Sequence, residues 1–404
     1  MIEHPIILFM AVLVLGYGIF SRLAERSVIT PAMFFVAVGI VASLLSFPLM
    51  SEGVKAPALK ILAELTLILV LFVDASTLDR KKLKIDRALP LRLLGIGLPL
   101  TMVLGALVAL PLFPEEPMWK ILLMALILSP TDAALGQAVV SSERVPLRIR
   151  QTINVESGLN DGIALPPILI CLAFLSGETH GDQGTVSYWM LFILKQFVYG
   201  PAIGGLVGWL GGMLVDTASK RGWMNHTFQQ LASVSLAVIA FTVAESVHGN
   251  GFIAAFFAGM MLGSRTPEIR ERIREFGEAE SHAMILFIFL LFGFILIPFS
   301  YPFWDWQAVV YALLSLTVIR MVPVAISLRG TGLTPSSVGF IGWFGPRGIA
   351  SVLYLLMVML EVGTEGYEKI ISIITLTIFL SIFLHGITAV PFSKIFSVPE
   401  DPKV

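Results

Sequence analysis

The sequence predicts an all-α polytopic membrane protein with about thirteen transmembrane helices. Of its 404 residues, 56% are hydrophobic and only 14% are charged, whereas soluble domains carry about 25% charged residues. Apolar runs of about 20 residues recur along the whole chain, and a helix needs about that length to cross a hydrocarbon core of roughly 30 Å. The alternating ten-residue pattern of an outer-membrane barrel is absent.

Polar breaks between the apolar runs locate the candidate spans. The thirteen spans cover approximately residues 5–20, 29–48, 57–76, 91–111, 119–139, 151–175, 187–215, 228–247, 251–264, 282–299, 304–328, 335–360 and 369–391. The connections between them are short, so we expect residues 1–404 to form one integral membrane domain without a soluble regulatory domain. Cys171 is the only cysteine, which rules out an intrachain disulfide.

Basic residues between the spans are unevenly distributed, and this bias sets the predicted orientation. Of the 27 Lys and Arg residues, 20 fall on one side or in the C-terminal tail, and four fall on the opposite side. By the positive-inside rule, the N-terminus lies outside and the C-terminus in the cytoplasm, as in a multi-pass protein of the cell (inner) membrane. The other three, Lys195, Arg320 and Arg347, fall inside spans, where each charge costs about 2.5 to 3.5 kcal/mol on insertion scales.

The stretch INVESGLNDGIALPP places Glu156, Ser157, Asn160 and Asp161 in an otherwise apolar span. In water Asn-Asp-Gly signals a turn, but a turn at lipid depth would leave backbone polar groups without partners, so we expect a helix. A rotation of about 100° per residue puts the four side chains on one side of that helix, with Asp161 near the membrane midplane. A structural polar network would use the same residue types, but two carboxylates and a nearby arginine favour a functional site.

Two other spans each contain a proline between small residues. They read ILSPTDAALG around Pro130 and GWFGPRGIAS around Pro346. Proline removes a backbone donor and frees the carbonyl four residues earlier, so we expect both spans to unwind locally near the midplane. Each break also contains a charged residue, Asp132 in the first and Arg347 in the second. Two ordinary proline kinks would not by themselves predict these charges. Asp132 also has a simpler explanation, as the cap of a half-helix.

The positions of the two broken spans predict internal symmetry. They are the fifth and twelfth of thirteen, so spans one to six and eight to thirteen form two repeats, each broken in its fifth helix. Because the offset of seven is odd, the repeats enter the membrane in opposite senses. This is the inverted-repeat architecture of secondary transporters, in which broken helices cross at a central ion site. The repeats cover about residues 5–175 and 228–391, and a linker helix covers about 187–215.

At these motifs the sequence resembles the monovalent cation/proton antiporters, and in particular the electroneutral branch of bacterial and archaeal sodium/proton exchangers related to the animal exchangers. The resemblance extends over essentially the whole chain. Its most specific part is PTDA followed about two dozen residues later by VESGLND. It implies a transporter without enzymatic activity or a cofactor, and a homodimer, because the family is usually dimeric.

The resemblance implies an ion-binding site in the fifth and sixth spans. Asp161 is similar to the aspartate that binds the ion and the proton, and Ser157 is similar to a hydroxyl ligand one turn earlier. Thr131 and Asp132 are similar to the ligands at the break in the fifth span. These four residues are therefore expected to hold Na⁺. Asp74 takes the place of an acid that contributes to the site in some relatives, or is instead a snorkelling carboxylate near a basic loop.

The resemblance also implies supporting residues. Glu156 resembles the family's buried glutamate, whose ion pair with an arginine holds the core together, and Arg320 resembles that arginine. Arg347 resembles the conserved arginine at the break in the twelfth span, next to Pro346. Many relatives have Thr-Asp-Pro at the first break, whereas here Pro130 precedes the Thr-Asp pair, so we expect that break to shift by about a residue.

One carboxylate that serves two ligands produces exchange. Burial favours the neutral form of Asp161, whereas a bound cation favours the anion, so protonation and cation binding exclude each other. Asn160 is a neutral amide where the electrogenic branch has a second aspartate, which predicts electroneutral exchange of one Na⁺ or Li⁺ for one H⁺ by alternating access. K⁺/H⁺ exchange is the alternative, because cavity size, which the sequence does not show, decides among these cations.

Other classes of protein fit the sequence less well. A channel would need a continuous polar pore, whereas the charges within the spans cluster at one depth. An intramembrane hydrolase would need a nucleophile with a base, and His385, inside the last span, has no Gly-x-Ser-x-Gly beside it. A transporter of organic anions on a similar scaffold is harder to exclude, but the buried acidic cluster favours a cation. The expected partners are a monovalent cation, a proton and the lipid bilayer, not nucleic acid.

A row of glycines in the seventh span predicts a close helix contact. Gly200, Gly204, Gly208 and Gly212 recur at every fourth residue, so they lie on one helix face that another helix can approach closely. Such a row packs either within the bundle or across a dimer contact.

Overall fold

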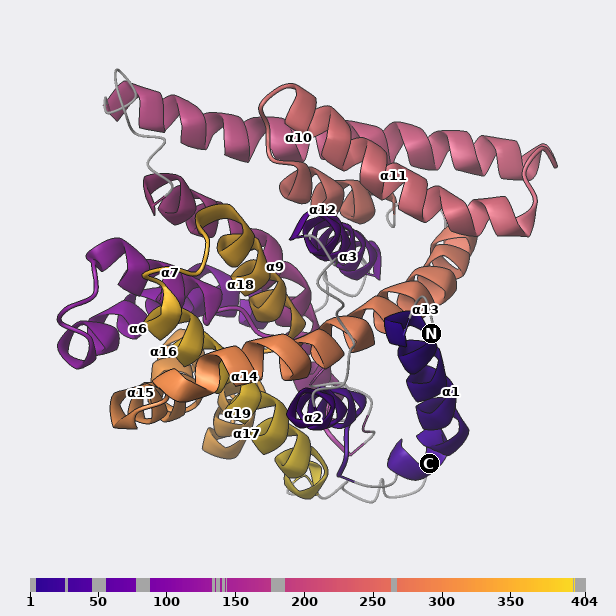
Figure 1. Cartoon of the computed structure of the whole chain (residues 1–404). Helices are drawn as coiled ribbons and strands as arrows, with labels where there is room; N and C mark the ends of the chain where they lie inside the picture. The colour runs from indigo at the N-terminus through magenta and orange to yellow at the C-terminus, as the bar shows by residue number, and fades with distance from the viewer. Residues whose placement is uncertain are drawn as a thin grey trace.

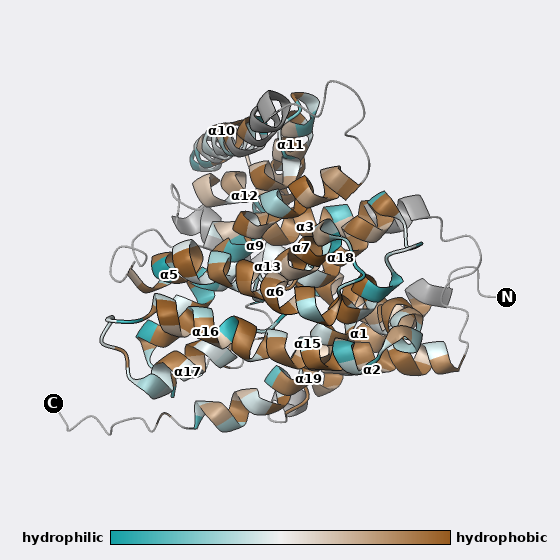
Figure 2. Cartoon of the chain, turned by 90° about the vertical axis from the view of Figure 1, so that its left-hand side faces the viewer, coloured by the Kyte–Doolittle hydropathy of each residue, from teal (hydrophilic) through white to brown (hydrophobic). Residues whose placement is uncertain are grey.

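The chain folds as a bundle of helices (Figure 1). The computed structural model describes residues 5–25, 28–45, 56–77, 88–132, 135, 139, 142, 144–175, 186–262, 267–394 and 396. Every regular element within these residues is a helix, and hydrophobic residues run along most of the helices (Figure 2). The all-helical part of the predicted fold class is therefore confirmed.

The helices follow one another in the chain with short connections. The first part of the chain contains α1 (Pro5–Glu25), α2 (Pro31–Leu44), α3 (Ala56–Thr77), α5 (Ala88–Arg92), the π-helical η1 (Leu93–Gly97), α6 (Leu98–Leu112), α7 (Met118–Ile127) and α9 (Leu147–Leu175). The middle contains α10 (Val186–Lys220), α11 (His226–Ser246) and α12 (Gly251–Leu262). The last part contains α13 (Pro267–Leu291), the π-helical η3 (Phe292–Leu296), α14 (Ile297–Ser300), the 3₁₀-helical η4 (Tyr301–Phe303), α15 (Trp306–Leu316), α16 (Val318–Ser327), α17 (Pro335–Trp343), α18 (Ile349–Val362) and α19 (Glu368–Ser393).

Many of these helices have the length and composition of membrane spans. Among the described residues, seven helices are long and apolar enough to cross a membrane. Five shorter apolar helices of 10–17 residues accompany them, and two of these, α7 and α18, belong to the spans predicted to be broken. The chain is therefore a multi-pass membrane protein.

One interruption was not predicted from the sequence. The span predicted at 304–328 divides into α15 and α16 at Thr317, whose backbone has φ −114° and ψ −92°. The Thr317 hydroxyl donates to the Leu313 carbonyl at 2.6 Å, and the Ser315 carbonyl accepts from Arg347 Nη2 at 3.1 Å. A side chain from a distant part of the chain, the break between α17 and α18, thus bonds a carbonyl next to this irregularity. The local sequence therefore did not reveal the interruption.

The glycine row packs within the bundle. In Figure 1, α10 and α11 lie together along one side of the molecule, with α12 beneath them. A Cβ atom at Gly204 would overlap the Ala254 backbone, and one at Gly208 would overlap the Ala258 backbone. The absence of side chains at these two positions lets α10 and α12 approach backbone to backbone.

Candidate functional site

The central polar stretch lies within α9, which is helical from Leu147 to Leu175. The Asn-Asp-Gly sequence forms no turn there, so the helix predicted from the membrane environment is confirmed. The polar side chains that this helix directs into the protein are each at most 6% exposed: Glu156, Ser157, Asn160 and Asp161. Pro166 and Pro167 follow within the same helix and remove the backbone donors for the carbonyls four residues before them.

Both predicted breaks are present, and they contact each other. Helix α7 ends at Ile127, and the other break separates Trp343, the last residue of α17, from Ile349, the first residue of α18. The Asp132 backbone N–H donates to the Pro346 carbonyl at 2.8 Å. Its carboxylate Oδ2 accepts from the Ile349 N–H at 2.6 Å. Asp132 therefore caps α18, a half-helix of the other broken span, and not a half-helix of its own span.

Arg347 places a positive charge where the two breaks contact each other. Its side chain is fully buried, and its guanidinium group donates to backbone carbonyls on three segments at 2.6 to 3.1 Å: Leu128, Gly345 and Ser315. Leu128 directly follows α7, so its carbonyl is one of those that a helix end leaves without an intrahelical donor. The arginine thus supplies donors to carbonyls that the breaks leave exposed, and those dipoles in turn stabilise its charge.

Glu156 and Arg320 form the ion pair expected from the sequence. Arg320 Nη1 lies 2.7 Å from Glu156 Oε1, and Arg320 Nη2 donates to Glu156 Oε2 at 2.8 Å. Both residues are only 1% exposed. A Cβ atom at Gly345 would overlap the Arg320 guanidinium group, so this glycine lets the pair lie directly against the second break. The two-point geometry neutralises both charges inside the protein.

Three polar side chains join α9 to the first break. Asn160 Nδ2 donates to Thr131 Oγ1 at 2.7 Å and lies 3.3 Å from the Thr131 carbonyl. The hydroxyl oxygens of Thr131 and Ser157 are 3.1 Å apart. The structure therefore brings Thr131, Ser157 and Asn160 together in a buried group of oxygen and nitrogen atoms.

One carboxylate oxygen of Asp161 is left without a hydrogen-bond partner among the residues that the structure describes. This oxygen, Oδ1, is buried, and the same holds for Asn160 Oδ1. The negative charges of Asp132 and Asp74 both act on this carboxylate. Asp74 is half-buried in α3. In the described part of the chain, no three His, Cys, Asp or Glu side chains gather closely enough to hold a metal ion. Carboxylate, amide and hydroxyl oxygens suit a weakly held hard cation.

The family model for the transmembrane sodium/hydrogen exchangers matches residues 9–395. The chain belongs to the sodium/hydrogen exchanger family. This is a family of transporters, so the protein is not an enzyme.

Relatives of this exchanger-family protein carry different names. A K(+)/H(+) antiporter NhaP from Alkalimonas amylolytica is 23% identical over 337 residues, which cover 83% of this chain but only 57% of that protein. A Na(+)/H(+) antiporter NhaP from Pseudomonas aeruginosa is 26% identical over 318 residues, which cover 73% of this chain and 71% of that protein. The structure of the sodium proton antiporter MjNhaP1 from Methanocaldococcus jannaschii at pH 8 has a TM-score of 0.80 at 16% identity and covers 97% of this chain and 98% of its own. The fold is therefore shared with that structure.

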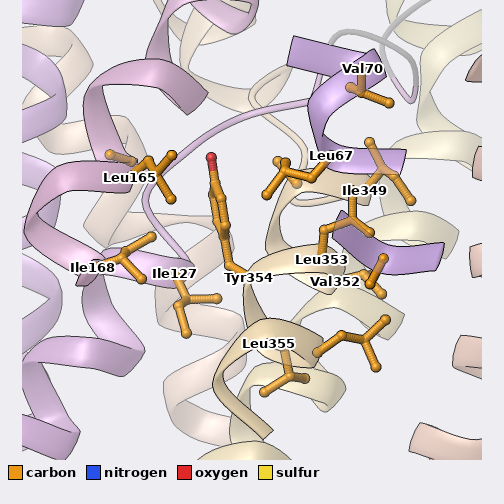
Figure 3. Close-up of a cluster of buried hydrophobic side chains, with 14 of the residues drawn as sticks. Leu67, Val70, Ile127, Leu165, Ile168, Ile349, Val352, Leu353, Tyr354 and Leu355 are labelled. Atoms are coloured by element: carbon orange, nitrogen blue, oxygen red, sulfur yellow. The ribbon is translucent and has the colours of Figure 1, made fainter. Parts of the chain in front are cut away.

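The candidate site also contains a residue that sequence reasoning missed. Tyr354 of α18 is fully buried, and its hydroxyl donates to the Asp161 backbone carbonyl at 3.0 Å. Figure 3 shows its ring among apolar side chains that include Leu67, Ile127 and Leu165. The sequence contains only a weak signal for a role of Tyr354, because a single tyrosine in an apolar helix is common. Helix α18 thus binds the Asp132 carboxylate through its N-terminus and the Asp161 backbone through its tyrosine.

Proposed function

We propose that this chain exchanges Na⁺ for H⁺ across the membrane at a site centred on Asp161. The observation that carries the proposal is the buried Asp161 Oδ1 without a partner, on a helix joined to the first of two crossing breaks. An anion left without a partner in a low-dielectric interior is costly, so the carboxylate has to hold a proton or a cation. Those are the two ligands of a cation/proton exchanger.

The proposed Na⁺ ligands are Asp161, Asp132, Thr131 and Ser157, with Asp74 contributing negative charge. The contact between the Thr131 and Ser157 hydroxyls supports this set, as does the action of the Asp132 and Asp74 charges on Asp161. Asp132 also caps α18. A cation at Asp132 would therefore act on the N-terminus of that half-helix, which links ion binding to the crossing of the two breaks.

Exchange follows from competition at one carboxylate. Na⁺ and H⁺ each neutralise Asp161 and exclude each other, and the empty charged site is expensive to move through the membrane interior. Only the loaded forms then alternate between the two sides, which couples the fluxes. Because Asn160 is neutral and Glu156 is already paired with Arg320, one carboxylate changes its ligand in each half-cycle. We therefore propose a stoichiometry of one Na⁺ to one H⁺.

The proposed architecture is thirteen spans in two inverted repeats, about residues 5–175 and 228–391, joined by α10. The two breaks, each next to a proline, support this arrangement, because an inverted repeat places its broken helices opposite each other at the centre. We also propose that the N-terminus lies outside, that the C-terminus lies in the cytoplasm, and that the protein works as a homodimer.

K⁺/H⁺ exchange is the second candidate. It is favoured by one finding, that a relative matched over 83% of this chain is named a K(+)/H(+) antiporter. The same oxygen ligands would serve both ions, and the size of the loaded site decides between them.

The deciding experiment uses purified protein in liposomes with an internal pH probe. Na⁺, Li⁺, K⁺ and an impermeant cation are added in turn, with the Asp161→Asn variant as the control. We expect Na⁺ and Li⁺ to drive proton movement in the wild type only, at a rate that does not depend on an imposed voltage. Proton movement with K⁺ alone would select the second candidate. The absence of any cation response would contradict both, and exchange by Asp161→Asn would contradict the site.

A further inference from the structure

A polar stripe on α19 contacts the break between α17 and α18. It consists of Ser381, His385 and Thr388, which are spaced four and three residues apart and therefore lie on one helix face. Ser381 and His385 are at most 1% exposed. None of the three belongs to the proposed ion site, although His385 is a titratable group buried in an apolar helix.

The stripe bonds to the backbone at the start of the break and to the backbone within it. His385 Nε2 lies 2.8 Å from the carbonyl of Trp343, the last residue of α17. Ser381 Oγ accepts from the backbone N–H of Arg347 at 2.7 Å, and it lies 3.2 Å from His385 Nδ1. Trp343 lies at the start of the non-helical segment, and Arg347 lies within it, two residues before α18 begins. One histidine and one serine therefore connect the start of the segment to a residue near its end.

Hydrogen-bond chemistry gives each atom a role. A carbonyl can only accept, so the bond to Trp343 requires the tautomer of the imidazole ring that carries its hydrogen on Nε2. The neutral ring then accepts at Nδ1 from the Ser381 hydroxyl, whose oxygen accepts the Arg347 N–H. The Ser381 carbonyl, 2.9 Å from Nδ1, can bond only a ring that carries a hydrogen on Nδ1, which is the other neutral tautomer or the doubly protonated ring. The charged groups that face His385 are Arg347 and Arg320, both of them cations. The neutral ring with its hydrogen on Nε2 is the form that completes the chain from Arg347 to Trp343.

The bonds from His385 and Ser381 lie next to the crossing of the two broken spans. The residue before Arg347 is Pro346, whose carbonyl accepts the Asp132 N–H at 2.8 Å. A shift of the Arg347 backbone would therefore move the contact that holds Asp132, and with it the first break. The Arg347 guanidinium group also holds the Leu128 carbonyl at the end of α7.

We propose that His385 is a positioning residue that, with Ser381, clamps Trp343 at the start of the break in the twelfth span to Arg347 within it, and thereby sets the geometry of the ion site. The functional part of this inference rests on the proposed exchange activity. His385 contacts no transported ion and acts through the backbone of Trp343 and Arg347.

Substitutions can separate the clamp from simple packing. His385→Phe keeps a ring against Trp343, whose ring centroid lies 5.0 Å from that of His385, but removes both hydrogen bonds. His385→Gln places an amide donor near the Nε2 position and restores the bond to Trp343. Thr388→Val is the matched control, because it removes the bond from Trp343 Nε1 to Thr388 Oγ1 at 2.9 Å, on the same helix face but not on the broken backbone.

The experiment measures Na⁺-driven exchange in liposomes as apparent KM and maximal rate, with equal amounts of folded full-length protein. We expect His385→Phe to raise KM by about fivefold, the equivalent of about one neutral hydrogen bond, and His385→Gln to restore it to within about twofold of the wild type. Thr388→Val should leave KM unchanged. If His385→Phe does not fold, Ser381→Ala replaces it, since it removes the acceptor of the Arg347 N–H and should raise KM similarly.

The possible failures are distinguishable. Wild-type protein without exchange would overturn the proposed function and this inference with it. Wild-type exchange together with an unchanged KM in His385→Phe or Ser381→Ala would overturn the clamp alone. An equal rise in KM in Thr388→Val and His385→Phe, or no recovery in His385→Gln, would also overturn it, because general packing of α19 would then explain the effect.

Discussion

Two carboxylates five positions apart on α9 are both buried, but they have different surroundings. Glu156 is 1% exposed and binds Arg320 through both of its oxygens. Asp161 is 6% exposed, and its Oδ1 has no hydrogen-bond partner within the described part of the chain. The first charge is neutralised permanently and serves the fold. Under the proposed function, the second is available to a ligand that can leave again, which is what a transport site requires.

The largest effect is expected from Asp161→Asn. The amide keeps the shape of the side chain but can neither release a proton nor attract a cation, so exchange should be lost completely. The free energy of unfolding should not fall, because a costly buried charge disappears. Proton flux and thermal unfolding are measured on the same preparations. A variant that still exchanges, or that unfolds much more easily than the wild type, would contradict the different roles of Asp161 and Glu156.

Glu156→Gln should produce the opposite pattern. It leaves Arg320 buried without its anion, which costs about 3 to 5 kcal/mol of stability. Little folded protein is expected, and Tm should fall steeply. The double variant Glu156→Leu with Arg320→Leu removes both charges and should recover most of the stability. If the single variant is as stable as the wild type, the pair is not structural.

Tyr354→Phe tests whether the position of the Asp161 backbone affects Na⁺ binding. It removes the bond to the Asp161 carbonyl and should cost about 1 kcal/mol of stability while raising the apparent KM for Na⁺ several-fold. Tyr311→Phe is the matched control, because Tyr311 is equally buried and donates to the Gly105 carbonyl at 3.3 Å. It should lose similar stability at most, with KM unchanged. Equal KM values in the two variants would mean that Tyr354 has no specific role in the ion site.

The smallest effect is expected from a partly exposed ion pair at the ends of two helices, between Asp305, the N-cap residue of α15, and Lys369, in the first turn of α19. Burial would raise the pKa of Asp305, but the hydrogen bonds from Lys369 and from the Ala308 N–H outweigh it and hold that pKa below its usual value. Because the folded-state pKa is lowered, the pair stabilises the protein at neutral pH, and this stabilisation is lost as the pH falls through that pKa. Both side chains are partly exposed, so it amounts to less than about 1 kcal/mol.

Unfolding of Lys369→Gln as a function of pH tests this prediction. Its small deficit in stability relative to the wild type should be present at neutral pH and vanish in acid, below the usual titration range of aspartate. A deficit that is unchanged in acid would mean that Lys369 acts through packing and not through the charge of Asp305.

The sequence was sufficient where local chemistry decides the structure. The helical state of Asn160 and Asp161 followed from the membrane environment, and the breaks near Pro130 and Pro346 followed from the missing backbone donors. The pairing of Glu156 with Arg320 came from the family resemblance, since no local signal joins residues 164 positions apart.

The sequence was insufficient where distant helices meet. Asp132 caps α18 across 217 positions, and Tyr354 reaches the Asp161 carbonyl across 193. These contacts depend on how α9 and the two breaks pack, which periodicity does not encode. The interruption at Thr317 is similar, because its neighbour Ser315 is bonded by an arginine from another span. The polar spacing of Ser381, His385 and Thr388 was visible, but its target was not.

Proton release on Na⁺ binding tests the central claim most directly. Purified protein in weakly buffered solution, at a pH where Asp161 is protonated, is titrated with Na⁺ while released protons and bound Na⁺ are both measured. If one carboxylate serves both ligands, each Na⁺ bound should displace about one proton in the wild type, and Asp161→Asn should neither bind Na⁺ nor release a proton. Na⁺ binding to the wild type without proton release, or undiminished binding by Asp161→Asn, would contradict the account.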